Sequence, residues 1–205
     1  MIQIRSDFTD YYDVLSNPNS NLIYNRFKQN SMSRGEALRF LRKYGIKTLN
    51  FGSVRTFNPL ETPRLVVYTN QNSHDFLGKR VCTYDEAISQ YGNCAASEFI
   101  ESDGRTLKYL QIGSRRFRLL FHNSEAYRGI LREGDLIAYE ELPRQYNFTL
   151  RLPIYSIDYI GKNNDMIAVD FNEVQKLSSI GVQGIITERE VIEEIYASLI
   201  NYHLI

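Results

Sequence analysis

Several residue types that mark particular protein classes are scarce in this 205-residue chain, which has no tryptophan, two cysteines and five prolines. Cys82 and Cys94 are too few for a disulfide framework and lack CxxC spacing, so a reduced, cytoplasmic environment is expected. No apolar run approaches the roughly 18–20 residues that a transmembrane helix requires. Residues 1–13 mix charged and aromatic side chains, unlike a signal peptide. We therefore expect no association with a membrane.

Linkers and internal repeats are also missing from the sequence. No Pro/Gly/Ser-rich stretch divides the chain, and 43% hydrophobic with 23% charged residues allow it to bury a core. The length suits one domain. We expect a single domain over residues 1–205, and the sequence leaves open an insertion near residues 33–62.

Charge is balanced overall but uneven along the chain. The 24 Lys and Arg residues offset 24 Asp and Glu residues, yet the net charge is +7 through Arg132 and −7 beyond it. A neutral total disfavours a dedicated nucleic-acid binder, whose domain is usually basic as a whole. The asymmetry allows one basic face, and it equally allows the two parts of the chain to attract each other.

The pattern of helix and strand signals indicates the fold class. Strands are predicted near residues 46–51, 65–68, 135–139, 148–152, 154–160 and 166–170. Because strands come in runs rather than alternating with helices, we expect an α+β fold with a largely antiparallel sheet and two to four packed helices. Three Ser/Thr-x-x-Glu capping boxes predict helix starts at Ser33/Glu36, Thr83/Glu86 and Thr187/Glu190.

The middle of the chain predicts a central three-stranded meander. Within residues 97–122, Asp103-Gly104 suits a type I′ turn and Gly113-Ser114 a type II′ turn. A two-residue second turn pairs Leu110 with Phe117 and Tyr109 with Arg118. One face is then apolar. The other face carries the candidate ligand-binding residues Tyr109, Arg116, Arg118 and His122.

This basic and aromatic face suggests an anionic ligand. Arginine binds phosphate through paired N–H groups and stacks on aromatic rings. Arg116 and Arg118 would neutralise a nucleotide-like ligand while Tyr109 stacks against it. The alternative is that both arginines are solvated or paired with the acidic C-terminal helix.

Common catalytic signatures are absent from the sequence. There is no GxxxxGK[ST] or GxGxxG phosphate loop and no GxSxG elbow. The three histidines, His74, His122 and His203, are far apart and form no metal-ligand spacing. We expect no metal and no cofactor, and a small buried hydrophobe is the expected role of each cysteine.

A cluster near the N-terminus offers a second chemical hypothesis. Two carboxylates flank two phenols at Asp10, Tyr11, Tyr12 and Asp13. On a helix, Asp10 and Asp13 would share a face and could bind a cation or act as an acid–base pair. In the structural alternative the tyrosines are buried and the acids cap helices or pair with Arg26 and Lys28.

The N-terminal segment also resembles a known family. DFTDYYDVL at residues 7–15, followed by LIYNR at 22–26, resembles the start of a family of uncharacterised proteins common in bacteriophage genomes and some bacteria. An F-x-G-K element is matched at 76–79, and a glycine-containing stretch leading into an apolar helix at 179–199. The resemblance implies a phage-like origin and no defined activity. It picks out Asp10, Tyr11, Tyr12, Asp13, Arg26, Gly78 and Lys79.

The first functional hypothesis is a non-enzymatic, phage-type binding protein. It would act in the host cytoplasm on a protein partner or an anionic, nucleotide-like ligand, because tyrosine-rich surfaces suit recognition. The second is a metal-assisted enzyme acting on nucleotides or nucleic acid through Asp10 and Asp13. The third is a virion or assembly component.

Overall fold

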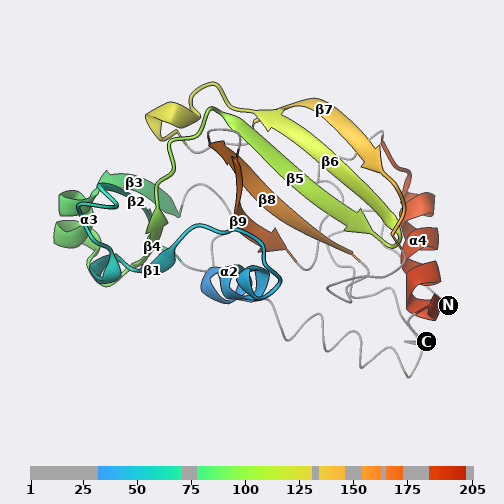
Figure 1. Ribbon diagram of the computed structural model, residues 1–205, viewed down its shortest axis with the longest axis horizontal. Coiled ribbons are helices and arrows are strands. Elements are labelled where there is room, and N and C mark those ends of the chain that lie inside the picture. Colours follow the sequence, from blue (N-terminus) through green and yellow to red (C-terminus); the bar gives the residue numbers. More distant parts are fainter. Residues whose placement is uncertain are drawn as a thin grey trace.

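The computed structural model describes residues 32–70, 78–130, 134–145, 154–162, 165–172 and 185–201, which form two antiparallel sheets and three α-helices (Figure 1). A four-stranded sheet has the order β1-β4-β2-β3, and a five-stranded sheet has the order β7-β6-β5-β8-β9. The strands are β1 (Phe51–Ser53), β2 (Arg64–Tyr68), β3 (Lys79–Thr83), β4 (Ala95–Glu98), β5 (Arg105–Ile112), β6 (Arg115–His122), β7 (Asp135–Leu142), β8 (Ile154–Lys162) and β9 (Asp165–Asn172). The helices are α2 (Arg34–Lys43), α3 (Tyr84–Tyr91) and α4 (Glu188–Asn201), with 3₁₀ turns η2 (Val54–Thr56) and η3 (Ala126–Arg128).

Helix α3 covers one face of the four-stranded sheet. Leu65 and Val67 of β2 are fully buried and cluster with Ala87 of the helix. Successive side chains of a strand alternate between faces, so Val66 and Tyr68 lie on the other face, where they form a separate cluster. This second face is the one that contacts α2, because Arg34 of that helix lies over the Tyr68 ring.

The five-stranded sheet is built around the β5–β6 hairpin. Gly113 and Ser114 form its two-residue turn, with Ile112 opposite Arg115, and Gly113 adopts a φ of 55°, which favours glycine. One face of this sheet holds an apolar cluster that includes Leu110 and receives Val191 of α4. Figure 1 shows α4 at the end of the sheet next to the hairpin turn, away from the four-stranded sheet.

Helix α2 packs on the opposite face of the five-stranded sheet. Its Leu41 is fully buried in a cluster with Tyr155 and Phe171 of strands β8 and β9. Leu38, one turn earlier, belongs to another cluster that includes Ile100 of the segment connecting the two sheets. Helix α2 therefore lies where the two sheets meet (Figure 1).

The predicted fold class is confirmed, and so is the register of the central hairpin. The fold is α+β with antiparallel sheets, and Leu110 pairs with Phe117 and Tyr109 with Arg118. The central meander consists of β5, β6 and β7, because β4 joins the other sheet and pairs with β1 and β2. The predicted two-residue turn at Asp103-Gly104 is therefore wrong, since residues 99–104 connect the two sheets. None of the described helices is long and apolar enough to cross a membrane.

Candidate active site at the junction of the two sheets

A row of charged side chains crosses three neighbouring strands of the five-stranded sheet. Lys108 of β5 is directly opposite Asp158 of β8, which is directly opposite Asp170 of β9. Directly opposed residues of antiparallel strands share a face, so the two carboxylates lie side by side with the ammonium group beside one of them. The next row of the same face contains Leu110, Ser156 and Asn172.

Asp158 is the most unusual member of the row. Its side chain is 30% exposed, yet the Oδ1 atom is itself buried and has no hydrogen-bond partner within the described part of the chain. Lys108 Nζ lies 3.5 Å from Oδ1, close enough for an ion pair. Burial, together with the neighbouring charge of Asp170, raises the pKa of the Asp158 carboxyl above its ordinary value. A buried carboxylate oxygen without a donor is costly for the folded protein.

Arg34 supplies a second cation from the first turn of α2. Its side chain is only 9% exposed, and Nη2 donates a hydrogen bond to Asp170 Oδ2 at 3.1 Å. Burial opposes the charge on the guanidinium group, but Asp170, together with Tyr68 and Asp158, more than compensates, so the pKa of Arg34 is raised. Each carboxylate of the row is thus neutralised by its own cation.

A β-bulge in β9 allows Arg34 to make these contacts. Asp158 pairs with Asp170 while Tyr159 pairs with Ala168, which leaves Val169 as the extra residue. The Val169 carbonyl accepts a hydrogen bond from Arg34 Nη1 at 2.9 Å. Bulges re-aim backbone and side-chain groups and are frequent beside active sites. Here the bulge places the Val169 carbonyl and the Asp170 carboxylate where the guanidinium group of Arg34 can donate to both.

The four-stranded sheet contributes an aromatic ring and a lysine to the same region. The guanidinium carbon of Arg34 lies 5.0 Å from the centre of the Tyr68 ring, a cation–π distance. Burial raises the pKa of the Tyr68 phenol, and its hydroxyl lies 3.1 Å from Ser97 Oγ. Lys79 is directly opposite Tyr68, so it lies on the same face of the small sheet. The site therefore spans both sheets.

The donor atoms of this site fit a hard divalent cation. Asp158, Asp170 and Asn172 offer carboxylate and amide oxygens on one face, and Mg²⁺ takes oxygen ligands and is commonly held by one or two carboxylates together with substrate phosphates. Within the described ranges there is no group of three or more His, Cys, Asp or Glu residues that could hold a metal alone. A metal at this site would need the amide of Asn172 or a bound ligand to complete its shell.

The basic face predicted from the sequence exists but lies on the other side of the sheet. Tyr109 donates a hydrogen bond to Gln111 and belongs to the cluster under α2. Arg116 donates to the Pro143 carbonyl at 2.6 Å, and Arg118 forms an exposed ion pair with Glu140 at 3.3 Å. His122, at the end of β6, is exposed. A ligand on this face stays a prediction.

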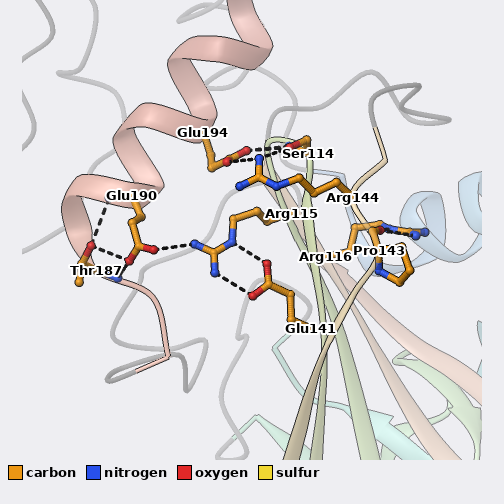
Figure 2. Close-up of polar contacts among 9 residues, drawn as sticks. All are labelled: Ser114, Arg115, Arg116, Glu141, Pro143, Arg144, Thr187, Glu190 and Glu194. Carbon is orange, nitrogen blue, oxygen red and sulfur yellow. Dashed lines mark hydrogen bonds and ion pairs between the residues drawn. The ribbon is translucent and has the colours of Figure 1, made fainter.

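A polar network fixes α4 against the hairpin and β7 (Figure 2). Arg115, 12% exposed, donates to Glu141 at 2.7 and 2.8 Å and to Glu190 at 2.9 Å. Hydrogen bonds from Thr187, followed by the one from Arg115, lower the pKa of Glu190 to about 2. Glu194 accepts hydrogen bonds from Ser114 and Arg144. The acidic helix thus pairs with Arg115 of the hairpin and with Arg144, which follows β7, as the charge asymmetry allowed.

The positions picked out by the N-terminal resemblance fall largely outside the described residues. Asp10, Tyr11, Tyr12, Asp13 and Arg26 all lie within residues 1–31, so the proposed carboxylate pair is untested. Gly78 is described, and its carbonyl accepts hydrogen bonds from the backbone N–H and hydroxyl of Thr69. Of the motif positions, Lys79 is the one that the structure brings to the face of Tyr68.

Comparison with known proteins identifies the fold. No family model and no curated protein matches the chain. The D-alanine–D-alanine ligase from Bacillus anthracis complexed with ATP is similar at a TM-score of 0.52 and 14% identity, covering 83% of this chain and 65% of that one. A RiPP-associated ATP-grasp ligase from Chryseobacterium gregarium, in complex with ADP and a leader and core peptide, gives 0.56 and 12%, covering 88% and 62%. The macrocyclase MdnC of Microcystis aeruginosa MRC, bound with precursor peptide MdnA, gives 0.51 and 14%, covering 84% and 60%.

The chain therefore has the fold of the ATP-grasp ligases and spans less than two thirds of the length of each of these three proteins. This finding overturns the first functional hypothesis. These three proteins are ligases or a macrocyclase, so the expectation of a non-enzymatic phage-type binding protein is wrong. The third hypothesis, a virion component, stays untested. The expectation of an anionic, nucleotide-like or protein ligand agrees with neighbours that hold ATP, ADP or a peptide.

Proposed function

We propose that this protein is an ATP-dependent ligase that binds the phosphates of ATP, with Mg²⁺, at the row formed by Lys108, Asp158 and Asp170. The observation that carries the proposal is the buried Oδ1 of Asp158, which forms an ion pair with Lys108 but accepts no hydrogen bond from the described residues. It lies beside a second carboxylate, in a fold shared with ligases that are bound to ATP or ADP. A divalent cation bound at about 2.1 Å would bring a positive charge closer to this oxygen than the ammonium group of Lys108, which lies 3.5 Å away.

The proposed metal ligands are the oxygens of Asp158, Asp170 and Asn172. The two carboxylates come from paired positions of β8 and β9, and Asn172 follows Asp170 on the same face. Bound Mg²⁺ would neutralise phosphate charge and orient the phosphate groups. Two carboxylates and an amide leave coordination positions for phosphate oxygens and water, as Mg²⁺ usually requires.

Lys108 and Arg34 are the proposed phosphate-binding cations. Without ligand, each is paired with one carboxylate of the row, at 3.5 and 3.1 Å respectively. A divalent cation between the carboxylates would take over their neutralisation, and the ammonium and guanidinium groups would then be available to phosphate oxygens. Lys79, which lies on the same face of the four-stranded sheet as Tyr68, would supply a third cation from that sheet.

The substrate class to examine first is an amino acid or a peptide. By their names, the ligases with this fold act on D-alanine or are bound to precursor, leader and core peptides. The acceptor is therefore best sought by measuring ADP formation from ATP against panels of amino acids and peptides.

Calorimetric titration of the full chain with ATP, with and without Mg²⁺, tests the proposal. We expect the wild type to bind ATP much more tightly with Mg²⁺. Asp158→Asn should lose that metal dependence, weakening Mg·ATP about 10-fold or more because a charged contact is worth about 1.5–3 kcal/mol. Asp165→Asn is the matched control, since Asp165 lies on β9 too but forms an exposed pair with Lys47. A wild type that does not bind Mg·ATP would overturn the proposal.

A further inference from the structure

Ser156 is a second polar group on the proposed metal face that has no partner. Its side chain is fully buried, and its Oγ atom has no hydrogen-bond partner among the described residues. Buried hydroxyls are nearly always hydrogen-bonded, because leaving one unpaired costs about 1–3 kcal/mol. Among the buried side-chain atoms described, only Ser156 Oγ and Asp158 Oδ1 share this condition.

The two atoms that lack a hydrogen-bond partner, Ser156 Oγ and Asp158 Oδ1, lie on one strand and on one face. Ser156 and Asp158 are two residues apart on β8, before the irregularity that follows Asp158, so their side chains point to the same side of the sheet. Ser156 is directly opposite Asn172, and Asp158 is directly opposite Asp170. Four side chains with oxygen atoms thus form two adjacent cross-strand pairs.

The spacing suits a water molecule held between the metal and Ser156. Residues two apart in a strand are separated by about 6.6 Å. Two metal–oxygen bonds of about 2.1 Å and one hydrogen bond of about 2.8 Å could span at most about 7 Å, so a metal held at Asp158 could reach Ser156 through one coordinated water. Metal-bound water is a strong hydrogen-bond donor, and Mg²⁺ usually retains several waters.

We propose that Ser156 is a positioning residue of the metal site, whose hydroxyl accepts a hydrogen bond from a water of the Mg²⁺ coordination shell. This inference rests on the proposed function, because it requires the metal at Asp158 and Asp170. Ser156 would fix the orientation of the metal shell without touching the metal. It also explains why the fold tolerates a buried hydroxyl with no partner in the protein.

The test uses Mn²⁺ as the probe and compares Ser156→Ala with wild type. We expect Mn²⁺ binding to the ATP complex, measured by electron paramagnetic resonance, to weaken about 10-fold, as is typical when an outer-shell partner of a metal is removed. ATP binding without metal should stay unchanged. Ser156→Thr, which keeps the hydroxyl, should retain most of the Mn²⁺ affinity.

Stability supplies an independent readout. Removing an unpaired buried hydroxyl should leave the melting temperature of the ligand-free protein unchanged or higher in Ser156→Ala. Ser97→Ala is the contrasting variant, because Ser97 is equally buried but lies 3.1 Å from the Tyr68 hydroxyl, so its loss should lower the melting temperature.

One result would overturn the inference while leaving the proposed function intact, namely a Ser156→Ala protein that binds Mn²⁺ in the ATP complex as tightly as wild type. If the melting temperature of that protein also falls, Ser156 holds only a structural water. A wild type that binds neither ATP nor Mn²⁺·ATP would instead remove the proposed function itself.

Discussion

Replacing Arg34 with methionine separates the structural role of this cation from its functional one. The guanidinium group is 9% exposed and its partner Asp170 17% exposed, so the substitution leaves a shielded carboxylate without its cation. Breaking a buried ion pair costs about 3–5 kcal/mol, and the residual exposure of Asp170 favours the lower value. At about 2–4 °C per kcal/mol for a chain of this size, we expect the melting temperature to fall by about 6–12 °C.

The same substitution should change metal and nucleotide binding in opposite directions. Without Arg34, the two carboxylates of the row retain only Lys108 as a described cation partner, so Mn²⁺ alone should bind more tightly. ATP should bind more weakly, because one phosphate-binding cation is lost. Arg34→Lys keeps the charge but loses the paired contacts with Val169 and Asp170, and it should be intermediate in stability.

Arg39→Met is the matched control for these measurements. Arg39 lies on the same helix and is exposed, so its loss should change the unfolding free energy by no more than about 0.5 kcal/mol. Thermal unfolding and calorimetric titration of the three variants decide the question. If Arg34→Met has the same melting temperature as Arg39→Met and binds Mn²⁺ and ATP as wild type does, the Arg34–Asp170 pair neither stabilises the fold nor takes part in binding.

Three further predictions concern the packing of α4 on the hairpin turn, the stability of the protein at low pH, and the sheet face that carries Arg118. Gly113→Ala should destabilise the protein more than Gly45→Ala in urea unfolding. Both glycines have positive φ, which costs about 1–2 kcal/mol for alanine, but a Cβ at Gly113 would collide with the backbone oxygen of Glu194, whereas Gly45 faces open space. Equal losses of stability would contradict the packing of α4 on the hairpin turn. The pKa of Glu190 is lowered from 4.5 to about 2, so its contribution to stability is present above pH 4.5 and is lost as the pH falls toward 2. The unfolding free energy of wild type should therefore fall more over this pH range than that of Glu190→Gln. Parallel curves of unfolding free energy against pH would refute this prediction. Arg118→Ala should leave calorimetric ATP affinity unchanged, and a marked weakening would place the ligand on the opposite face.

Local features of this fold could be predicted because local chemistry determines them. Ser33 with Glu36 and Thr83 with Glu86 form capping boxes as expected. The Gly113-Ser114 turn sets the register of β5 against β6. In each case the interacting groups are within a few residues of one another, so side-chain type and spacing decide the outcome.

The sheet membership of β4 and the active-site row depend on contacts between distant segments. β5 pairs with β8 across more than 40 residues, and no local pattern specifies that choice. One signal was available: Asp158 and Asp170 interrupt two predicted apolar strands that flank a short polar turn. Pairing those two strands as a hairpin places both carboxylates on one face. The sequence prediction gave each strand without its pairing partner and so did not bring the carboxylates together.

The most direct test of the account is the position of a metal in crystals of the protein grown with ATP and Mn²⁺. If Asp158 and Asp170 hold the metal, an anomalous peak for Mn²⁺ is expected within bonding distance of their carboxylate oxygens, with ATP phosphate oxygens completing the metal shell. A nucleotide bound elsewhere, or Mn²⁺·ATP bound with both carboxylates still paired to Lys108 and Arg34, would contradict it.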